Sequence, residues 1–355
     1  MLTLPHSSQL TVAKLAASFA NTSATYKFYW LLAIIESVEQ GEQYIPKRKL
    51  FARMIANAWY TVNYFKVSFG KQDSIQDAVK EILESEPLLT VDSKKEYLLN
   101  ILGNSDSKIT KQCLNHFNLN VPHWFLSPWF SKAGLQNDSQ YKKYIYNASQ
   151  NFENNCLYAL YDTHIEVNGI WVDYIKQNAR VLKDFCYWNL CLFLQTRNPN
   201  VPDIPNKIIQ PVFRNTLAKQ RKDYWNIVFN ELGTIDCIFT NEPLTKESYA
   251  LDHFVPHAFV SHDLMWNLIP IDPVFNCKKS DKLPSIEKHF NKFFDLQKEA
   301  YQIVKSHNAR SKFLEEYLTI FPVLDSADDF AYQRYKENIQ PLVSIAGNNG
   351  FGYLQ

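Results

Sequence analysis

The chain has 355 residues, of which 46% are hydrophobic and 21% charged, and its formal net charge is +1 at pH 7. This balance excludes a protein that coats DNA through general basicity, and the apolar content excludes a chain that is disordered throughout. Only 9 residues are glycine, and no G-x-G-x-x-G or G-x-x-x-x-G-K-[ST] motif occurs, which argues for helices and against the common glycine-rich nucleotide-binding folds.

Signals for export or membrane insertion are missing from the sequence. The first 20 residues lack a basic region followed by an apolar stretch of signal-peptide length, and the longest apolar run, residues 28–35, is far too short to cross a bilayer. The 6 cysteines are too sparse for a disulfide scaffold and include no C-x-x-C pair. We therefore expect a cytoplasmic protein with reduced cysteines and no membrane contact.

The first part of the chain is predicted to be helical. Residues 26–38 are rich in bulky apolar side chains over a length that suits a buried helix. Pro46 opens a second helix, whose basic start at residues 47–53 is expected to be solvated. Residues 74–77 form a Ser-x-x-Asp relative of a capping box and begin a third helix.

A change of pattern follows at residues 157–175. Alternating apolar and polar residues flank Asn168-Gly169, a dipeptide that favours the two-residue type I′ turn of a β-hairpin. A long helix through Trp188 comes next, and residues 198–205 then contain three prolines, which a helix interior does not tolerate. This proline cluster predicts a domain boundary.

Beyond the boundary, the periodicity predicts a helix over residues 213–232, strands with an inner loop over 249–271, and helices over 286–321. The last 31 residues, mildly acidic and ending in a glycine-rich stretch, are expected to form a loosely ordered tail. The predicted fold class is α+β and mostly α-helical. The predicted domains are a helical recognition domain with one β-hairpin (1–200), a second domain with C-terminal helices (201–320, core 235–284) and the tail (321–355).

Potential ligands are densest within residues 251–284. His253, His257 and His262 fall within ten residues of one another, beside Asp252 and Asp263. Further along, the chain reads Trp266-Asn267 and then Asn276-Cys277-Lys278-Lys279-Ser280-Asp281-Lys282-Leu283-Pro284. The spacings Asp-His-x-x-Pro, an Asn fourteen residues after the His, and Asn-x-x-Lys-Ser-Asp-x-x-Pro resemble the HNH endonuclease family. They are most similar to the HNH domains of RNA-guided CRISPR nucleases.

This resemblance implies a ββα-metal fold that hydrolyses DNA phosphodiester bonds with a divalent cation. Asp252 and Asn276 match the family's metal ligands, and His253 matches its general base. Asn267 matches the family's middle Asn, which holds a loop more than it reacts, and Lys279 matches a basic position that could reach a phosphate oxygen. The implied catalytic set is therefore His253, Asn267 and Lys279.

The residue types suit this chemistry. A hard cation such as Mg²⁺ or Mn²⁺ prefers oxygen ligands and takes only one or two protein groups beside the substrate phosphate. His253, next to Asp252 but on the other face of a strand, can face the water, and its ordinary pKa of about 6.5 leaves it mostly neutral near pH 7. The alternative, in which His253 and His257 bind a soft metal together, is disfavoured because Pro256 between them breaks helical spacing.

The segment departs from the family in its cysteines. Many HNH proteins bracket the hairpin with two C-x-x-C pairs that bind zinc, whereas here only Cys237 and a lone Cys277 remain. We therefore expect no structural zinc, and we expect helical flanks to replace it.

Basic residues gather just before the predicted site. Five of them and no acid lie within residues 207–222, namely Lys207, Arg214, Lys219, Arg221 and Lys222. With His257 and Lys278, the residues Lys219, Arg221 and Lys222 are the candidate contacts to DNA phosphates; an ordinary solvated helix face is the equal alternative.

The expected partner is double-stranded DNA, with a companion subunit, an activator or a second copy of the chain as further possibilities. One site cuts one strand, so a monomer would nick. By analogy with free-standing HNH proteins, a restriction or anti-phage defence role is expected. The alternative hypothesis is a catalytically silent nucleic-acid-binding or partner-docking module that uses the hairpin as a scaffold.

Overall fold

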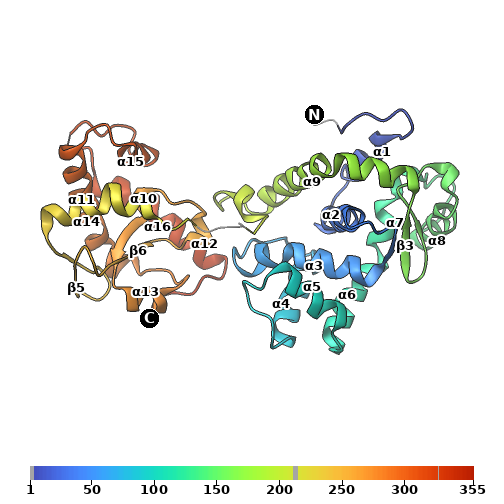
Figure 1. Cartoon of the computed structure of the whole chain (residues 1–355), viewed down its shortest axis with the longest axis horizontal. Helices are drawn as coiled ribbons and strands as arrows, with labels where there is room; N and C mark the ends of the chain where they lie inside the picture. Colours follow the sequence, from blue (N-terminus) through green and yellow to red (C-terminus); the bar gives the residue numbers. More distant parts are fainter. Residues whose placement is uncertain (1–3, 211–214, 327) are drawn as a thin grey trace. The chain divides into compact units, whose positions relative to one another are not determined.

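The structure is a computed structural model that describes residues 4–210, 215–326 and 328–355 (Figure 1). It is mostly α-helical, with a few small antiparallel sheets, as the sequence predicts. The chain divides into two compact units. The N-terminal unit comprises Met1–Pro199 and Lys207–Gln210, and the C-terminal unit comprises Asn200–Asn206 and Pro211–Gln355. No helix among the described residues has the length and apolarity that crossing a membrane requires.

The N-terminal unit is a helical assembly with one small sheet. Its elements are α1 (Val12–Ala17), α2 (Tyr26–Glu39), β1 (Tyr44–Pro46), α3 (Lys47–Asn63), α4 (Ser74–Ser85), α5 (Lys95–Asn104), α6 (Lys108–His116), α7 (Val121–Phe125), α8 (Asp138–Ser149), β2 (Tyr158–Leu160), β3 (His164–Val167) and α9 (Gly169–Arg197).

Helix α2 is the centre of this unit and confirms the predicted buried helix. All residues from Phe28 to Ile35 are buried, because the helix packs between α9 and α3 (Figure 1). Trp30 donates a hydrogen bond to the Tyr158 hydroxyl at 2.9 Å, so even the polar atom of this buried aromatic side chain is satisfied. A helix that is apolar all round is stable only in such a core.

The sheet corrects one prediction. Its strand order is β1-β3-β2, and the hairpin turn lies between β2 and β3 at residues 161–163, not at Asn168-Gly169. Asn168 has φ −59°, which a type I′ turn does not allow, and its side chain accepts a hydrogen bond from the Ile170 amide as the N-cap of α9. The Asn-Gly pair therefore starts a helix.

The first turns of α3 and α4 also refine the predictions. Pro46 precedes α3 as expected, but the basic start of this helix is only partly solvated: Lys49 is exposed, whereas Lys47 is only 6% exposed and Arg53 only 3%. Arg53 lies 3.7 Å from Glu36 across the contact with α2. Helix α4 begins at Ser74 as predicted, although its cap is Asp73, whose carboxylate accepts from the Ile75 amide.

The C-terminal unit contains two small antiparallel sheets of two strands each. Its elements are α10 (Ala218–Gln220), a π-helical turn (Arg221–Trp225), α11 (Asn226–Leu232), β4 (Ile235–Asp236), β5 (Pro243–Leu244), β6 (Ala250–His253), α12 (His257–Val260), a 3-10 turn (Met265–Asn267), β7 (Leu268–Ile271), α13 (Pro273–Lys279), α14 (Ile286–His307), α15 (Lys312–Glu315) and α16 (Tyr332–Asn348). Of the helix predicted over residues 213–232, the structure has residues 218–232, and the first two residues of the prediction lie outside the described ones.

The expectation of a loosely ordered tail was wrong. Helix α16 packs against α14 and buries Tyr335, Ile339 and Val343. The end of the chain is tied down as well, because the Leu283 amide donates to the Gly352 carbonyl at 2.7 Å and the Leu354 amide donates to the Leu283 carbonyl at 2.9 Å. The apolar face of α16 repeats at helical spacing between polar residues, a signal that the low local hydrophobicity obscured.

Candidate active site

Two strands and one helix bring the predicted site together. Strands β6 and β7 pair antiparallel, with Asp252 opposite Ile269 and His253 opposite Leu268. Helix α13 follows β7 directly, starts behind the cap of Asp272 and packs against β6. This ββα arrangement places His253 and Asp252 on the strand and Asn276 and Lys279 on the adjoining helix.

Lys279 lies inside the site. Its side chain is fully buried, and Nζ donates to Asp252 Oδ2 at 2.7 Å and to the His253 carbonyl at 2.8 Å. Burial opposes ionisation of Asp252, but His253 and the Lys279 ammonium outweigh it and lower the pKa of Asp252 to about 2. The geometry is at odds with a lysine that reaches out to a phosphate: Lys279 holds the metal-ligand candidate Asp252 against the strand.

His253 is nearly buried between two carboxylates. Its Nε2 lies 2.9 Å from Asp263 Oδ1, and its Nδ1 lies 3.9 Å from Asp252 Oδ1. Burial alone would lower the pKa of His253, but Asp252 and Asp263 together raise it. Sequence reasoning did not single out Asp263, although it is the sole acidic residue in the loop of residues 254–267.

Asn267 is completely buried, and both polar atoms of its side chain are hydrogen-bonded. Its amide nitrogen donates to the Val255 carbonyl at 2.8 Å, and its amide oxygen accepts from the Val255 amide at 2.8 Å. The Asn267 carbonyl also accepts from the Phe254 amide at 2.7 Å. The side chain therefore clamps the chain just after β6, and its complete burial keeps it from contacting a substrate.

Asn276 and Asp252 fit a hard cation. Asn276 is half-buried on α13, and its side-chain amide makes no hydrogen bond with the part of the chain that the structure describes. Asp252 uses Oδ2 for Lys279, whereas its Oδ1 makes no hydrogen bond within the described residues and lies 3.9 Å from His253. Two oxygen donors with open coordination capacity suit Mg²⁺ or Mn²⁺, which keep most of their waters. Among the described residues, no group of three or more His, Cys, Asp or Glu side chains is arranged so that it could hold a metal ion.

The loop between β6 and β7 is anchored by the C-terminal helices. Gln297 of α14, fully buried, donates to the carbonyls of Met265 and Leu268 at 3.2 and 2.7 Å. Glu316 accepts from the Met265 amide at 2.6 Å, and the Tyr335 hydroxyl donates to the Trp266 carbonyl. Helices that follow the motif in sequence thus fix the loop that carries Asp263.

Aromatic packing holds the β4–β5 hairpin. Phe239 stacks on Phe275 at 5.2 Å between ring centroids and on Phe254 at 6.4 Å, and it also contacts His289 of α14. The buried Cys237 sulfur accepts from the Asp272 amide at 3.4 Å. The hairpin is therefore joined to α13 and α14 by side-chain packing.

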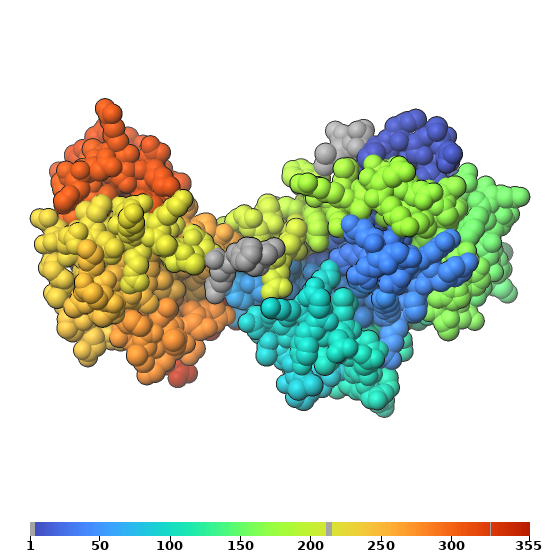
Figure 2. Space-filling model, in the orientation of Figure 1, coloured from blue at the N-terminus to red at the C-terminus, as the bar shows by residue number. Residues whose placement is uncertain are grey.

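The basic candidates are not all available to DNA. Lys219 and Lys222 are exposed on the helical segment of residues 218–232, which lies on the surface of its unit (Figure 2). Arg221 instead stacks on the Tyr249 ring, 3.9 Å from its centroid, and donates to the Tyr249 carbonyl. Lys207 is buried in the N-terminal unit, and Arg214 lies outside the described residues.

The remaining two candidates for nucleic-acid contact lie beside the site. Lys278 is exposed in the last turn of α13, next to the buried Lys279. His257 is half-buried at the start of α12, with its ring 5.2 Å from that of His253, and its Nε2 is 4.0 Å from Asp263 Oδ1. Lys219, Lys222 and Lys278 are thus exposed, whereas His257 and Arg221 are half-buried and Arg221 is held by Tyr249.

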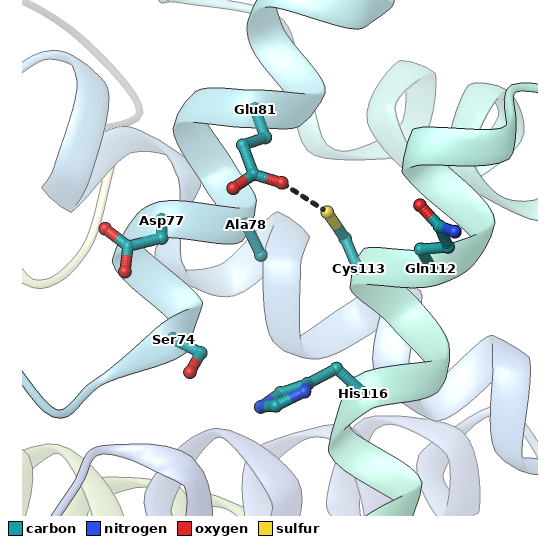
Figure 3. A pocket seen from close by; sticks show the side chains of 7 residues that line it. All are labelled: Ser74, Asp77, Ala78, Glu81, Gln112, Cys113 and His116. Carbon is teal, nitrogen blue, oxygen red and sulfur yellow. Dashed lines mark hydrogen bonds between the residues drawn. The ribbon is translucent and has the colours of Figure 1, made fainter.

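A hollow in the N-terminal unit is a less suitable candidate for a catalytic site. It measures about 280 Å³ between α4 and α6, and Asp77, Glu81, Cys113 and His116 are among its lining residues (Figure 3). The Cys113 thiol donates to Glu81 at 3.3 Å, and burial together with this carboxylate raises the pKa of Cys113 to about 12. A thiol that stays protonated is a poor nucleophile, so this hollow does not form a thiol active site.

Comparison with known proteins agrees with the ββα geometry. Residues 237–285 match the family model described as HNH endonuclease. No curated protein and no solved structure matches the chain. The segment that contains Asp252, His253 and Asn276 is therefore similar to the HNH endonucleases, which are generally nucleases that use divalent metal ions and act on DNA.

Proposed function

We propose that this protein is an endonuclease that hydrolyses DNA phosphodiester bonds with Mg²⁺ or Mn²⁺ held by Asp252 and Asn276. The observation that carries the proposal is the convergence of His253, Asp252 and Asn276 on one strand-and-helix corner, within the segment that matches the HNH family. His253 acts as the general base. Nearly buried side chains in such a corner are held in fixed orientations, as catalysis requires.

The chain's own residues carry the proton step. His253 takes a proton from a water molecule, whose oxygen then forms a bond to phosphorus while the bond from phosphorus to the 3′ oxygen breaks. The 3′ oxygen takes up a proton from solvent, so the products carry a 5′ phosphate and a 3′ hydroxyl. The cation, when bound, supplies positive charge that stabilises the developing negative charge on the phosphate oxygens.

Lys279 and Asn267 support this step from inside the protein. Lys279 orients the Asp252 carboxylate through its 2.7 Å ion pair, and Asn267 holds the backbone at Val255. Neither side chain is exposed, so we assign both to positioning of the site and not to contact with the phosphate.

The substrate we propose is double-stranded DNA, of which each site cuts one strand. Exposed Lys219, Lys222 and Lys278 give it sequence-independent phosphate contacts, with His257 at the edge of the site. Because the chain carries a net charge of only +1, its affinity for DNA should be modest, which favours an activator, a companion subunit or a second copy of the chain. We place the protein in the cytoplasm, in restriction or anti-phage defence.

Supercoiled plasmid incubated with the full-length protein and Mg²⁺ or Mn²⁺ tests the proposal. We expect nicked circles with 5′-phosphate ends from the wild type and at least about a 100-fold lower rate from His253→Ala. His307→Ala, an exposed histidine on α14, is the matched control and should cut normally. Equal cleavage by wild type and His253→Ala, or a wild type that leaves all DNA intact with both metals, would overturn the assignment.

A further inference from the structure

The carboxylate of Asp263 lies against the far side of the His253 ring from Asp252. Its Oδ1 is 2.9 Å from His253 Nε2, a distance typical of a charge-assisted hydrogen bond. Its Oδ2 accepts from the Asn215 side-chain amide at 2.7 Å. His253 and Asn215 together lower the pKa of Asp263 although burial opposes this, so the carboxylate is ionised and can only accept hydrogen bonds.

An acceptor at this position decides where the imidazole proton sits. A neutral imidazole carries one proton, on either Nδ1 or Nε2. Because Asp263 faces Nε2 and cannot donate, the proton must lie on Nε2, which leaves the lone pair on Nδ1. That nitrogen faces Asp252, with 3.9 Å between Nδ1 and Oδ1, a gap in which neither atom is hydrogen-bonded to the other.

We propose that Asp263 is a positioning residue that selects the Nε2–H tautomer of His253 and thereby makes Nδ1 the atom that accepts the proton from water. This inference rests on the proposed nuclease function. It assigns Asp263 a role that differs from those of the metal-ligand candidates, since Asp263 acts through the ring of His253.

The backbone around His253 does not need Asp263 for its support. His253 is paired to Leu268 across the strands, Lys279 donates to its carbonyl, and Asn267 clamps the residues that follow. The loop that carries Asp263 is itself anchored by Gln297 and Glu316. With strand and loop each held independently, Asp263 makes the hydrogen-bond contact that can set the proton and the rotation of the ring.

The second nearby imidazole does not replace this contact. His257 Nε2 lies 4.0 Å from Asp263 Oδ1, beyond hydrogen-bond distance, whereas His253 Nε2 is at 2.9 Å. Asp263 is therefore bonded to the ring on β6 in preference to the ring on α12.

Asp263→Asn in the full-length protein tests the proposal, because it preserves shape while its amide can donate to Nε2 and favour the opposite tautomer. We expect kcat for plasmid nicking in Mg²⁺ to fall by about 10²- to 10⁴-fold, with KM changed less than about threefold. Asp236→Asn, an exposed carboxylate on β4, is the matched control and should keep its rate. A kcat for Asp263→Asn within about threefold of wild type would overturn the proposal.

Nitrogen-15 NMR of histidine-labelled protein separates this proposal from the nuclease function. The His253 signals are identified by their loss in His253→Ala, and the spectra are recorded above the pKa of the ring. We expect wild type to show a protonated Nε2 and a bare Nδ1, and Asp263→Asn to lose this preference. A wild-type ring protonated on Nδ1 contradicts the proposal. If the protein gives the expected spectrum but cuts no DNA, the role of Asp263 in setting the tautomer stands and the proposed nuclease function is rejected.

Discussion

The Lys279 ammonium lies 2.7 Å from Asp252 Oδ2 and is fully shielded from solvent. Asp252 is also the metal-ligand candidate. The Lys279 ammonium and a bound metal ion would therefore compete, since both positive charges stabilise the same carboxylate. The pair therefore gives the site a charge-balanced form without metal, and it predicts how the site responds when either charge is removed.

Lys279→Met removes the buried charge and keeps the length of the side chain. We expect the free energy of unfolding to fall by about 1–3 kcal/mol, less than for a fully buried pair because Asp252 is 20% exposed. Mg²⁺ should then raise the melting temperature more in the variant than in wild type, because it supplies the missing positive charge. Thermal denaturation with and without Mg²⁺ measures this. Lys278→Met, the exposed neighbour, is the control, and equal stabilisation of all three proteins would contradict the competition.

Asn276→Ala should separate metal binding from stability. Its amide makes no hydrogen bond within the described residues, so its loss should change the free energy of unfolding by less than about 0.5 kcal/mol. Nicking should require at least tenfold more Mg²⁺. A Mg²⁺ titration of the nicking rate beside chemical denaturation tests both statements, with Asn348→Ala, an exposed residue on α16, as control. An unchanged Mg²⁺ requirement would remove Asn276 from the ligand set.

Asn267→Ala should have the opposite profile. Its side chain satisfies both backbone groups of the buried Val255, and truncation leaves both without partners. We expect the free energy of unfolding to fall by about 2–4 kcal/mol. Urea denaturation of the variant measures the loss. Stability equal to wild type would show that the clamp is dispensable.

Lys219→Gln combined with Lys222→Gln should weaken DNA binding without changing the chemistry. Two phosphate contacts contribute a slope of about −0.9 each to the dependence of log K on log salt concentration, so the slope should become shallower by about 2. Fluorescence anisotropy with a labelled duplex at several salt concentrations gives the slope, with Mg²⁺ replaced by Ca²⁺ to limit cutting. Lys246→Gln, which is hydrogen-bonded to Asn230, serves as the control. An unaltered slope would assign these lysines to a solvated helix face.

The stability of the N-terminal unit should decline in mild acid because of His123. Burial, and then the charges of Lys47 and Lys142, lower the pKa of His123 from 6.5 to about 4. His123 therefore binds a proton near pH 6.5 in the unfolded chain but only near pH 4 in the folded chain. The free energy of unfolding thus falls as the pH drops through this window. His123→Gln should show a smaller decline in melting temperature between these pH values. An identical decline in both proteins would exclude His123 as a source.

The local sequence pattern predicted an element correctly where the residues that stabilise that element are close together in the sequence. The apolar run at residues 28–35 predicts α2, Pro46 predicts the start of α3, and the spacing from Asp252 to Asn276 predicts the hairpin-and-helix motif that the HNH match supports. Local pattern failed at Asn168-Gly169, because the same dipeptide can close a hairpin or cap a helix, and packing of the following residues as α9 decided between them.

The sequence by itself determined the family of the motif and its candidate ligands, because the spacing of Asp, His and Asn is a property of the chain. Only the tertiary structure decided what surrounds them. It buried Lys279 against Asp252 and placed Asp263 within hydrogen-bond distance of His253 Nε2. It also made α14 and α16 the supports of the active-site loop through Gln297 and Tyr335. Charge pairing and burial depend on segments far apart in sequence, so no local pattern encodes them.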